Sequence, residues 1–227
     1  MEISEILKQL WQSGTLVTGI WETVYLTLLS TVIAYLLGLP LGVVLAVTGE
    51  GGIRPVKWLN RVLGFIVNIF RSIPFIVLMV AMLPVAKAVV GTSIGNKAMI
   101  VMLVIAAAPY IARMVESSLK EVSPGVIEAA QSMGTSNFGI ILKVLIPEAK
   151  PSLIVGAVIS TVTVLGYSAM AATIGGGGLG SIAITWGHQR FNDDVIWVCV
   201  ILIIVIVQII QELGMLIARK TDRRVRK

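Results

Sequence analysis

Long stretches without a charged side chain are the feature that most limits how this chain can fold. Residues 23–49, 151–189 and 195–211 contain no Asp, Glu, Lys or Arg, and neither do the shorter stretches 72–86 and 98–112. Over the whole chain 13% of the residues are charged and 56% are hydrophobic, whereas a soluble domain has about 25% charged residues. The sequence therefore predicts an integral membrane protein and excludes a soluble, disordered or disulfide-built fold.

The apolar stretches predict an all-α protein with about five transmembrane helices. A helix needs about 20 residues to cross the bilayer, and continuously apolar runs argue against strands. The expected spans are 23–49, a second that extends back from 72–86 through 62–70, then 98–115, about 153–172, and 195 to about 218. Four or six spans are the open alternatives. Gly38, Pro40 and Gly42 are expected to bend or thin the first span.

Three segments are expected along the chain. Residues 1–19 form an amphipathic interfacial segment, residues 20–211 form the transmembrane domain, and residues 212–227 hold the end of the last helix and a basic tail. If the N-terminus lies outside, 14 of the 18 Lys and Arg residues fall on the inner side. The positive-inside rule therefore predicts an outer N-terminus and an inner C-terminus in the cytoplasmic membrane. A basic tail of this kind favours membrane lipid rather than nucleic acid as its partner.

The inner loop of residues 116–150 is too long to be a simple connection and is expected to have structure of its own. Ser123 and Pro124 predict a helix start, with the Ser side chain capping free amides. Gly134 then predicts the helix stop. A second amphipathic helix is expected from Ser136 or Asn137, and Pro147 and Pro151 are expected to break it before span four. On the residues alone, a plain amphipathic connector is the simpler interpretation.

A motif in this loop resembles a known one. Glu128-Ala129-Ala130, three residues, Gly134, nine residues, Val144, one residue and Ile146-Pro147 resemble the "EAA" loop of binding-protein-dependent ABC importer permeases, whose form is E-A-A-x3-G-x9-I-x-L-P. Val144 and Ile146 depart from it conservatively. Further segments are similar to the methionine-uptake permeases in particular: Arg71–Ile76, Val90–Gly95, Ala108–Glu116, Gly166–Met170 and Gly175–Gly180.

This resemblance implies the type I ABC importer permease architecture and a set of partners. It implies a homodimer of five-helix subunits, two cytoplasmic ATP-binding cassette ATPase subunits and an extracytoplasmic methionine-binding lipoprotein, with L- and D-methionine as cargo. The loop helix would be the coupling helix that docks on the ATPase, with Glu128, Ala129, Ala130, Gly134 and Pro147 as its site residues. Another amino acid or glycine betaine is the alternative cargo.

The chain is expected to be a transport subunit and not an enzyme. It contains no G-x-x-x-x-G-K-[ST] phosphate loop, so ATP and Mg²⁺ are expected on a separate ATPase and no cofactor on this chain. His188, the only histidine, is expected to be exposed and without metal partners. An ion-coupled secondary transporter is the distant alternative, but such proteins usually carry ionisable groups near the midplane. An intramembrane enzyme is the third alternative, but the expected spans contain no His/Glu metal spacing and no convincing Ser/Lys or paired-Asp arrangement for catalysis.

Span four is expected to line the translocation path. It is rich in small and hydroxyl residues, for most of which close helix packing is the simpler role. Tyr167, Ser168 and Met170 are the path or gate candidates, because a flexible Met can repack in a gate. The glycine run 175–180 has two interpretations, a flexible outer turn or an outer gate element. Arg113 is expected to reach the membrane interface at the end of span three, and a local helix pair with Glu116 is expected as well.

Overall fold

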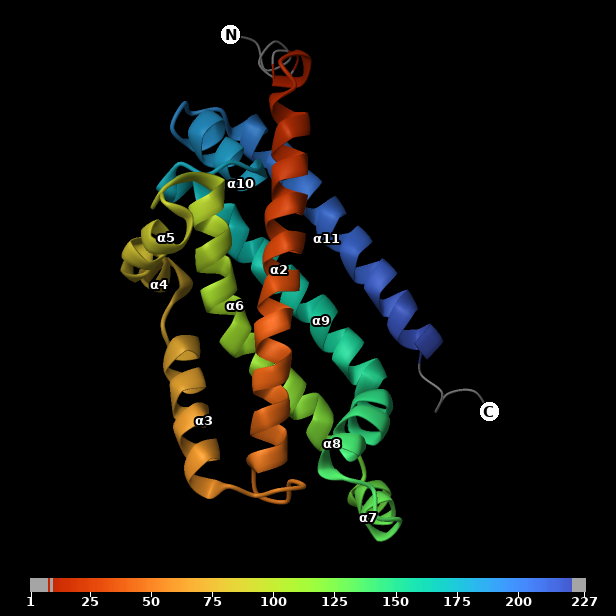
Figure 1. The fold of residues 1–227 in the computed structure, drawn as a ribbon. Coiled ribbons are helices and arrows are strands. Elements are labelled where there is room, and N and C mark those ends of the chain that lie inside the picture. The colour runs from red at the N-terminus through yellow and green to blue at the C-terminus, as the bar shows by residue number, and fades with distance from the viewer. Residues whose placement is uncertain (1–7, 9, 222–227) are drawn as a thin grey trace. The chain divides into compact units, whose positions relative to one another are not determined.

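A computed structural model describes residue 8 and residues 10–221, which are helical along most of their length (Figure 1). Residues 1–7 and 9 of the expected interfacial segment, and residues 222–227 of the basic tail, lie outside this described part. The elements are α2 (Thr15–Thr48), α3 (Lys57–Ser72), α4 (Phe75–Ala81), α5 (Leu83–Val90), α6 (Gly95–Lys120), α7 (Pro124–Ser132), α8 (Asn137–Ile140), η1 (Ile141–Leu145), α9 (Ile146–Ser168), η2 (Ala169–Ile174), α10 (Leu179–Ile182), η3 (Ala183–His188) and α11 (Asp193–Thr221).

The described helices agree with the prediction of an all-α protein with about five spans. Within residues 8 and 10–221, four helical runs are long and apolar enough to cross a membrane: α2, α6, the run Asn137–Ile174 and α11. A fifth is counted if α3 and α4 are taken as one broken span. In α11 only 11% of the most apolar window is buried within the chain, against 50% in α6. Most of the α11 surface is therefore free to contact lipid or another protein.

Span two is broken rather than continuous, which the uncharged stretches did not reveal. Helix α3 ends at Ser72, and α4 begins at Phe75. Between them Ile73 is extended, with φ −84° and ψ 126°. Because the ring of Pro74 disfavours the helical conformation in the residue before it, Ile73 cannot continue α3. The break follows from this one proline.

The expected break at Pro147 and Pro151 is wrong. Both prolines lie inside α9, and the helical run continues from Asn137 to Ile174. A proline ring normally collides with the carbonyl four residues earlier, which for Pro147 is that of Lys143. Lys143 lies in η1, a π-helical turn in which the Ile146 amide donates to the Ile141 carbonyl. This wider turn accommodates Pro147 without ending the run.

The chain divides into two compact units. One contains Met1–Ile33, Pro74–Ile105 and Thr161–Gln211, and the other contains Ala34–Ile73, Ala106–Ser160 and Glu212–Lys227. The core of the first unit includes Leu10, Leu16, Leu179, Val195 and Cys199. The core of the second includes Leu45, Val67 and Ala112.

Within the second unit, Gly38 and Gly42 allow α2 to approach α6 closely. A Cβ atom at Gly38 would lie 2.8 Å from the carbonyl oxygen of Ala108, and one at Gly42 would collide with the carbonyl oxygen of Ala112. Any side chain at either position would separate the two helices. The expectation that these glycines thin the first span is confirmed, while Pro40 is accommodated inside a continuous α2.

Candidate functional site

Helix α7 carries the Glu-Ala-Ala motif and follows the end of α6 (Figure 1). It begins at Pro124, as the sequence predicts, but the Ser123 side chain makes no capping hydrogen bond. The backbone carbonyl of Ser123 instead accepts from the Val126 amide at 3.1 Å. The pre-set φ of Pro124 is enough to start the helix, because the proline has no amide that needs a partner. The expected side-chain cap at Ser123 is therefore wrong.

Gly134 ends α7 in the way the motif predicts. Its φ is +73°, a left-handed backbone conformation that costs free energy for most residues other than Gly and Asn. The Thr135 amide donates to the Ala130 carbonyl at 3.1 Å, and the Gly134 amide donates to the Gln131 carbonyl at 2.9 Å. These two bonds form a Schellman motif, which satisfies the last carbonyls of the helix. The Ala130 and Gly134 positions of the motif thus act together in one turn.

The two alanines of the motif have different environments. Ala130 is buried within the chain, whereas Ala129 and Glu128 are exposed. Helix α7 contacts α8 and the π-helical turn η1, so it has support on one side. Two large apolar side chains that follow the motif in the sequence are also exposed, Met133 at 78% and Phe138 at 71%. A small exposed residue at position 129, together with exposed apolar side chains in the same loop, is compatible with contact to a partner.

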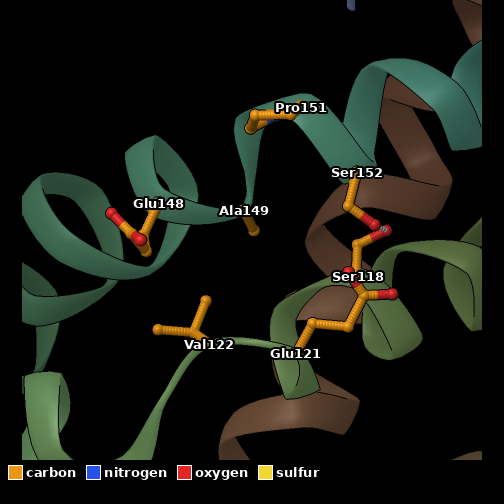
Figure 2. Close-up of a pocket in the computed structure, with 7 residues that line it drawn as sticks. All are labelled: Ser118, Glu121, Val122, Glu148, Ala149, Pro151 and Ser152. Atoms are coloured by element: carbon orange, nitrogen blue, oxygen red, sulfur yellow. Dashed lines mark hydrogen bonds between the residues drawn. The ribbon is translucent and has the colours of Figure 1, made fainter. Parts of the chain in front are cut away.

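The two ends of the 116–150 loop are joined by a hydrogen bond between α6 and α9. The Ser152 hydroxyl donates to the Ser118 hydroxyl at 3.0 Å, as the dashed line in Figure 2 shows. The same residues line a pocket of about 30 Å³ together with others from both ends of the loop: Glu121, Val122, Glu148, Ala149 and Pro151. A pocket of that volume holds about one water molecule and is too small for an amino acid. It is a feature of the loop's base and not a substrate site.

A small ionic network fixes the start of the loop to α3. Glu116 is only 4% exposed and accepts from Arg113 and from Lys120, each at 2.7 Å. The Nη2 atom of Arg113 donates to the Gly64 carbonyl in α3 at 3.1 Å, while its Nη1 atom binds Glu116. The expected pairing of Arg113 with Glu116 is confirmed.

The three candidates for the translocation path have unequal access to the surface. Met170 is 38% exposed, and the half-buried ring of Tyr167 stacks on Phe75 with centroids 4.6 Å apart and planes 6° apart. Ser168 is 3% exposed, and its hydroxyl donates to the Leu165 carbonyl at 2.7 Å. Within this chain Tyr167 and Met170 can meet a substrate more readily than Ser168, whose hydroxyl supports its own helix.

The glycine loop 175–180 is more tightly held than a flexible turn. Its Gly177 amide donates to Asn96 Oδ1 at 2.7 Å, and its Gly178 amide donates to Glu22 Oε2 at 2.9 Å. The amide of Leu179 donates to Thr23 Oγ1 at 2.8 Å. Three consecutive amides are thus bound by side chains from α2 and α6. These three bonds favour a held loop over a freely flexible turn, and both interpretations of the loop, as an outer turn or as an outer gate element, stay predictions.

Glu22 was not singled out from the sequence, although one signal was available. It is the last charged residue before the first uncharged stretch of 23–49. A carboxylate beside an apolar stretch is usually interpreted as a residue exposed to water. Nothing near Glu22 in the sequence indicates its hydrogen bond to a loop 156 residues away. His188 is exposed, as expected, and the described residues include no group of three His, Cys, Asp or Glu side chains that could hold a metal ion.

Comparison with known proteins gives agreement over almost the whole chain. The family model "Binding-protein-dependent transport system inner membrane component" matches residues 38–227. A relative from Vibrio cholerae named as a probable D-methionine transport system permease protein is 49% identical over 93% of this chain and 94% of its own length. The methionine import system permease protein of Bacillus subtilis is 46% identical over 79% of this chain and 81% of its own length.

Solved structures agree with the fold. A chain from an inward-facing MetNI methionine ABC transporter superposes with a TM-score of 0.90 at 46% identity, over 92% of this chain and 97% of that one. A chain from an amino acid ABC transporter crystallised with histidines superposes with a TM-score of 0.76 at 20% identity, over 97% of this chain and 99% of the other. At that lower identity the second similarity shows the fold alone.

Proposed function

The chain belongs to the family of binding-protein-dependent transport system inner membrane components, and we propose that it is the permease subunit of an ATP-driven methionine importer. It provides the translocation path through the membrane and is driven by a separate ATPase. The observation that carries this proposal is the match to methionine permeases over nearly the full length of both chains. The exposed α7 with its Glu-Ala-Ala motif supplies the surface that such a subunit needs for its ATPase.

Two copies of the chain would form the working permease. About five spans are too few to enclose a path for an amino acid, and two copies supply about ten, with the path along their twofold axis. The weakly buried α11 leaves a large apolar surface for lipid or for the second copy. An extracytoplasmic methionine-binding lipoprotein would deliver the cargo to this dimer. ATP and Mg²⁺ would bind the two ATPase subunits.

In the proposed mechanism the ATPase dimer closes and pushes the two α7 helices together. Each α7 would lie in a cleft of one ATPase, with Ala129 allowing close approach and Glu128 pairing with a basic or amide group there. Gly134 aims the helix, and Pro147 follows the π-helical turn that supports it. The movement rocks the spans and opens the path to each side in turn. Tyr167, Ser168 and Met170 form the gate region, in which the Met170 side chain from each copy closes the path.

The proposed orientation places the N-terminus outside and α7 inside the cell. It follows from the distribution of Lys and Arg residues and from the need for α7 to meet a cytoplasmic ATPase. L- and D-methionine are the proposed cargo, in keeping with the names of the relatives.

The test is transport in vesicles reconstituted with the chain, its ATPase and its binding lipoprotein. We expect uptake of labelled D- and L-methionine that needs ATP, is inhibited by vanadate and is unaffected by an ionophore. Uptake that an ionophore abolishes and vanadate does not would overturn the proposal in favour of an ion-coupled transporter. The chain should also elute as a dimer in mild detergent, and a monomer that still transports would contradict the twofold path.

A further inference from the structure

We propose that Glu22 and Asn96 are positioning residues for the gate, because together they clamp the glycine loop against the turn that carries Met170. The inference rests on the proposed function, since it assigns the gate to that turn. All the residues involved lie in the same compact unit. No metal, cofactor or second copy is needed for the arrangement.

The clamp consists of the Glu22 carboxylate and the Asn96 side-chain amide, each of which binds one backbone amide of the loop. Glu22 Oε1 accepts from Asn96 Nδ2 at 2.9 Å, and Glu22 Oε2 accepts from the Gly178 amide at 2.9 Å. Asn96 uses its remaining oxygen to accept from the Gly177 amide at 2.7 Å. Each polar atom of the pair therefore has a defined donor or acceptor role. Hydrogen bonds to a carboxylate are stronger than those between neutral groups.

The loop has the backbone shape that such a clamp requires. The amides of Gly177, Gly178 and Leu179 point at three neighbouring side chains, Asn96, Glu22 and Thr23. The φ of +97° at Gly178 gives the backbone a conformation that glycine adopts readily. A Cβ atom at Gly177 would collide with the Glu22 carboxylate. Glycine at this position therefore leaves room for the side chain of Glu22. The acceptors for these amides all belong to the protein itself, so the loop does not need a bound phosphate or substrate to order it.

The same loop packs directly on the turn that carries the gate candidate. A Cβ atom at Gly180 would collide with the backbone of Ala169, the residue before Met170. The Gly176 amide donates to the Ala171 carbonyl, the residue after Met170, at 2.8 Å. The backbone on both sides of Met170 is thus in contact with the loop. A shift of the loop would move Met170, and the clamp is what prevents that shift.

Exchanging the carboxylate of Glu22 and the amide of Asn96 tests whether their hydrogen bonds, and not only the volume of their side chains, hold the loop. In Glu22→Gln, the new side-chain NH2 group faces either the Asn96 NH2 donor or the Gly178 amide donor, so one hydrogen bond is lost in each orientation. In Asn96→Asp, two carboxylates face each other. The double variant Glu22→Gln/Asn96→Asp keeps all three bonds, because the donor now lies on residue 22 and the acceptor on residue 96. Glu50→Gln is the control, since the Glu50 side chain is 88% exposed.

The first readout is hydrogen–deuterium exchange of the 175–180 segment in the assembled transporter, which does not depend on transport. In each single variant we expect exchange to rise at least about tenfold, the ratio for losing one hydrogen bond to a charged group. The double variant and Glu50→Gln should exchange like the wild type. The second readout is the number of ATP molecules hydrolysed per methionine taken up, which should rise in the single variants and return in the double variant.

The outcomes decide between the two proposals. If wild-type vesicles show no ATP-driven methionine uptake, the proposed function fails while the exchange measurement still tests the clamp. Single variants with wild-type exchange, or a double variant no better than either single one, would overturn the clamp. If a single variant does not assemble, assembly and wild-type exchange of the double variant support the clamp, and failure of the double variant overturns it. If the double variant has wild-type hydrogen–deuterium exchange but still hydrolyses more ATP per methionine than the wild type, the link between the clamp and the gate is overturned.

Discussion

Two segments of this chain depend on glycine for opposite reasons. Gly134 ends α7 with a φ of +73°, and a Cβ atom built there would meet nothing within 4 Å. Gly180 has no such φ, but a Cβ atom there would collide with the backbone of Ala169. The first glycine ends a helix that is largely exposed and is proposed to dock on a partner, whereas the second allows two parts of the same chain to pack. What a methyl group would meet at each glycine therefore separates a need for a backbone conformation from a need for space.

The largest effect is expected at the exposed alanine of α7. Replacing Ala129 by Trp adds bulk where the ATPase cleft is proposed to close, without entering the chain's own core. ATP-driven methionine uptake should fall at least about 30-fold, the loss typical of a residue at the centre of an interface. The Ala129→Ser variant, which stays small, should transport like the wild type. A folded Trp variant with normal uptake would show that α7 does not enter a cleft.

Substitution of the packed glycine is expected to lower the stability of the protein. Gly180→Ala forces the loop away from Ala169, and overpacking of this kind costs about 1–3 kcal/mol. The purified transporter should therefore unfold at a lower temperature, as measured by thermal denaturation in detergent. Gly180→Asn should be at least as destabilising. Unchanged thermal unfolding of both variants would mean that the loop is not packed as described.

The exposed glycine should give the smallest effect and one that depends on the substituent. Gly134→Val forces a branched residue into the left-handed region, at a cost of about 1–2 kcal/mol, and uptake should decrease about five- to tenfold as α7 loses its direction. Gly134→Asn should retain most of the uptake, because Asn accepts that conformation. Equal uptake by the Val and Asn variants would contradict the assigned role of the φ angle.

The contrast between these segments also explains what the sequence could predict. The ends of α7 and the start of α8 follow from local chemistry, because Pro124, Gly134 and Ser136 act within a few residues of themselves. Ser136 does cap α8, accepting from the Gly139 amide at 3.2 Å. Charge-free length likewise predicts the spans, and a family motif identifies the loop. Each of these signals lies in one contiguous stretch.

What could not be predicted depends on residues far apart in the chain or on small changes in helix geometry. The Glu22 clamp joins positions 22, 96 and 178, and nothing near any of them marks the others. Pro147 predicts a break because a regular α-helix excludes it, but the π-helical turn before it changes the geometry locally. Ser123 has the right residue type for a cap, yet its backbone carbonyl takes the amide instead. Such choices depend on tertiary structure.

Cross-linking from α7 in the assembled transporter tests the central claim most directly. Cys199 is the only cysteine of the chain, so Cys199→Ala provides a background in which Glu128→Cys and Thr92→Cys can be introduced separately. Thr92 lies in the connection between α5 and α6, which the proposed orientation places outside the cell. The account predicts that the residue 128 variant cross-links to the ATPase, with a yield that changes on ATP binding, and is not labelled by an impermeant maleimide outside the cell. The residue 92 variant should behave in the opposite way. Labelling of residue 128 from outside, or no cross-link to the ATPase, would contradict the account.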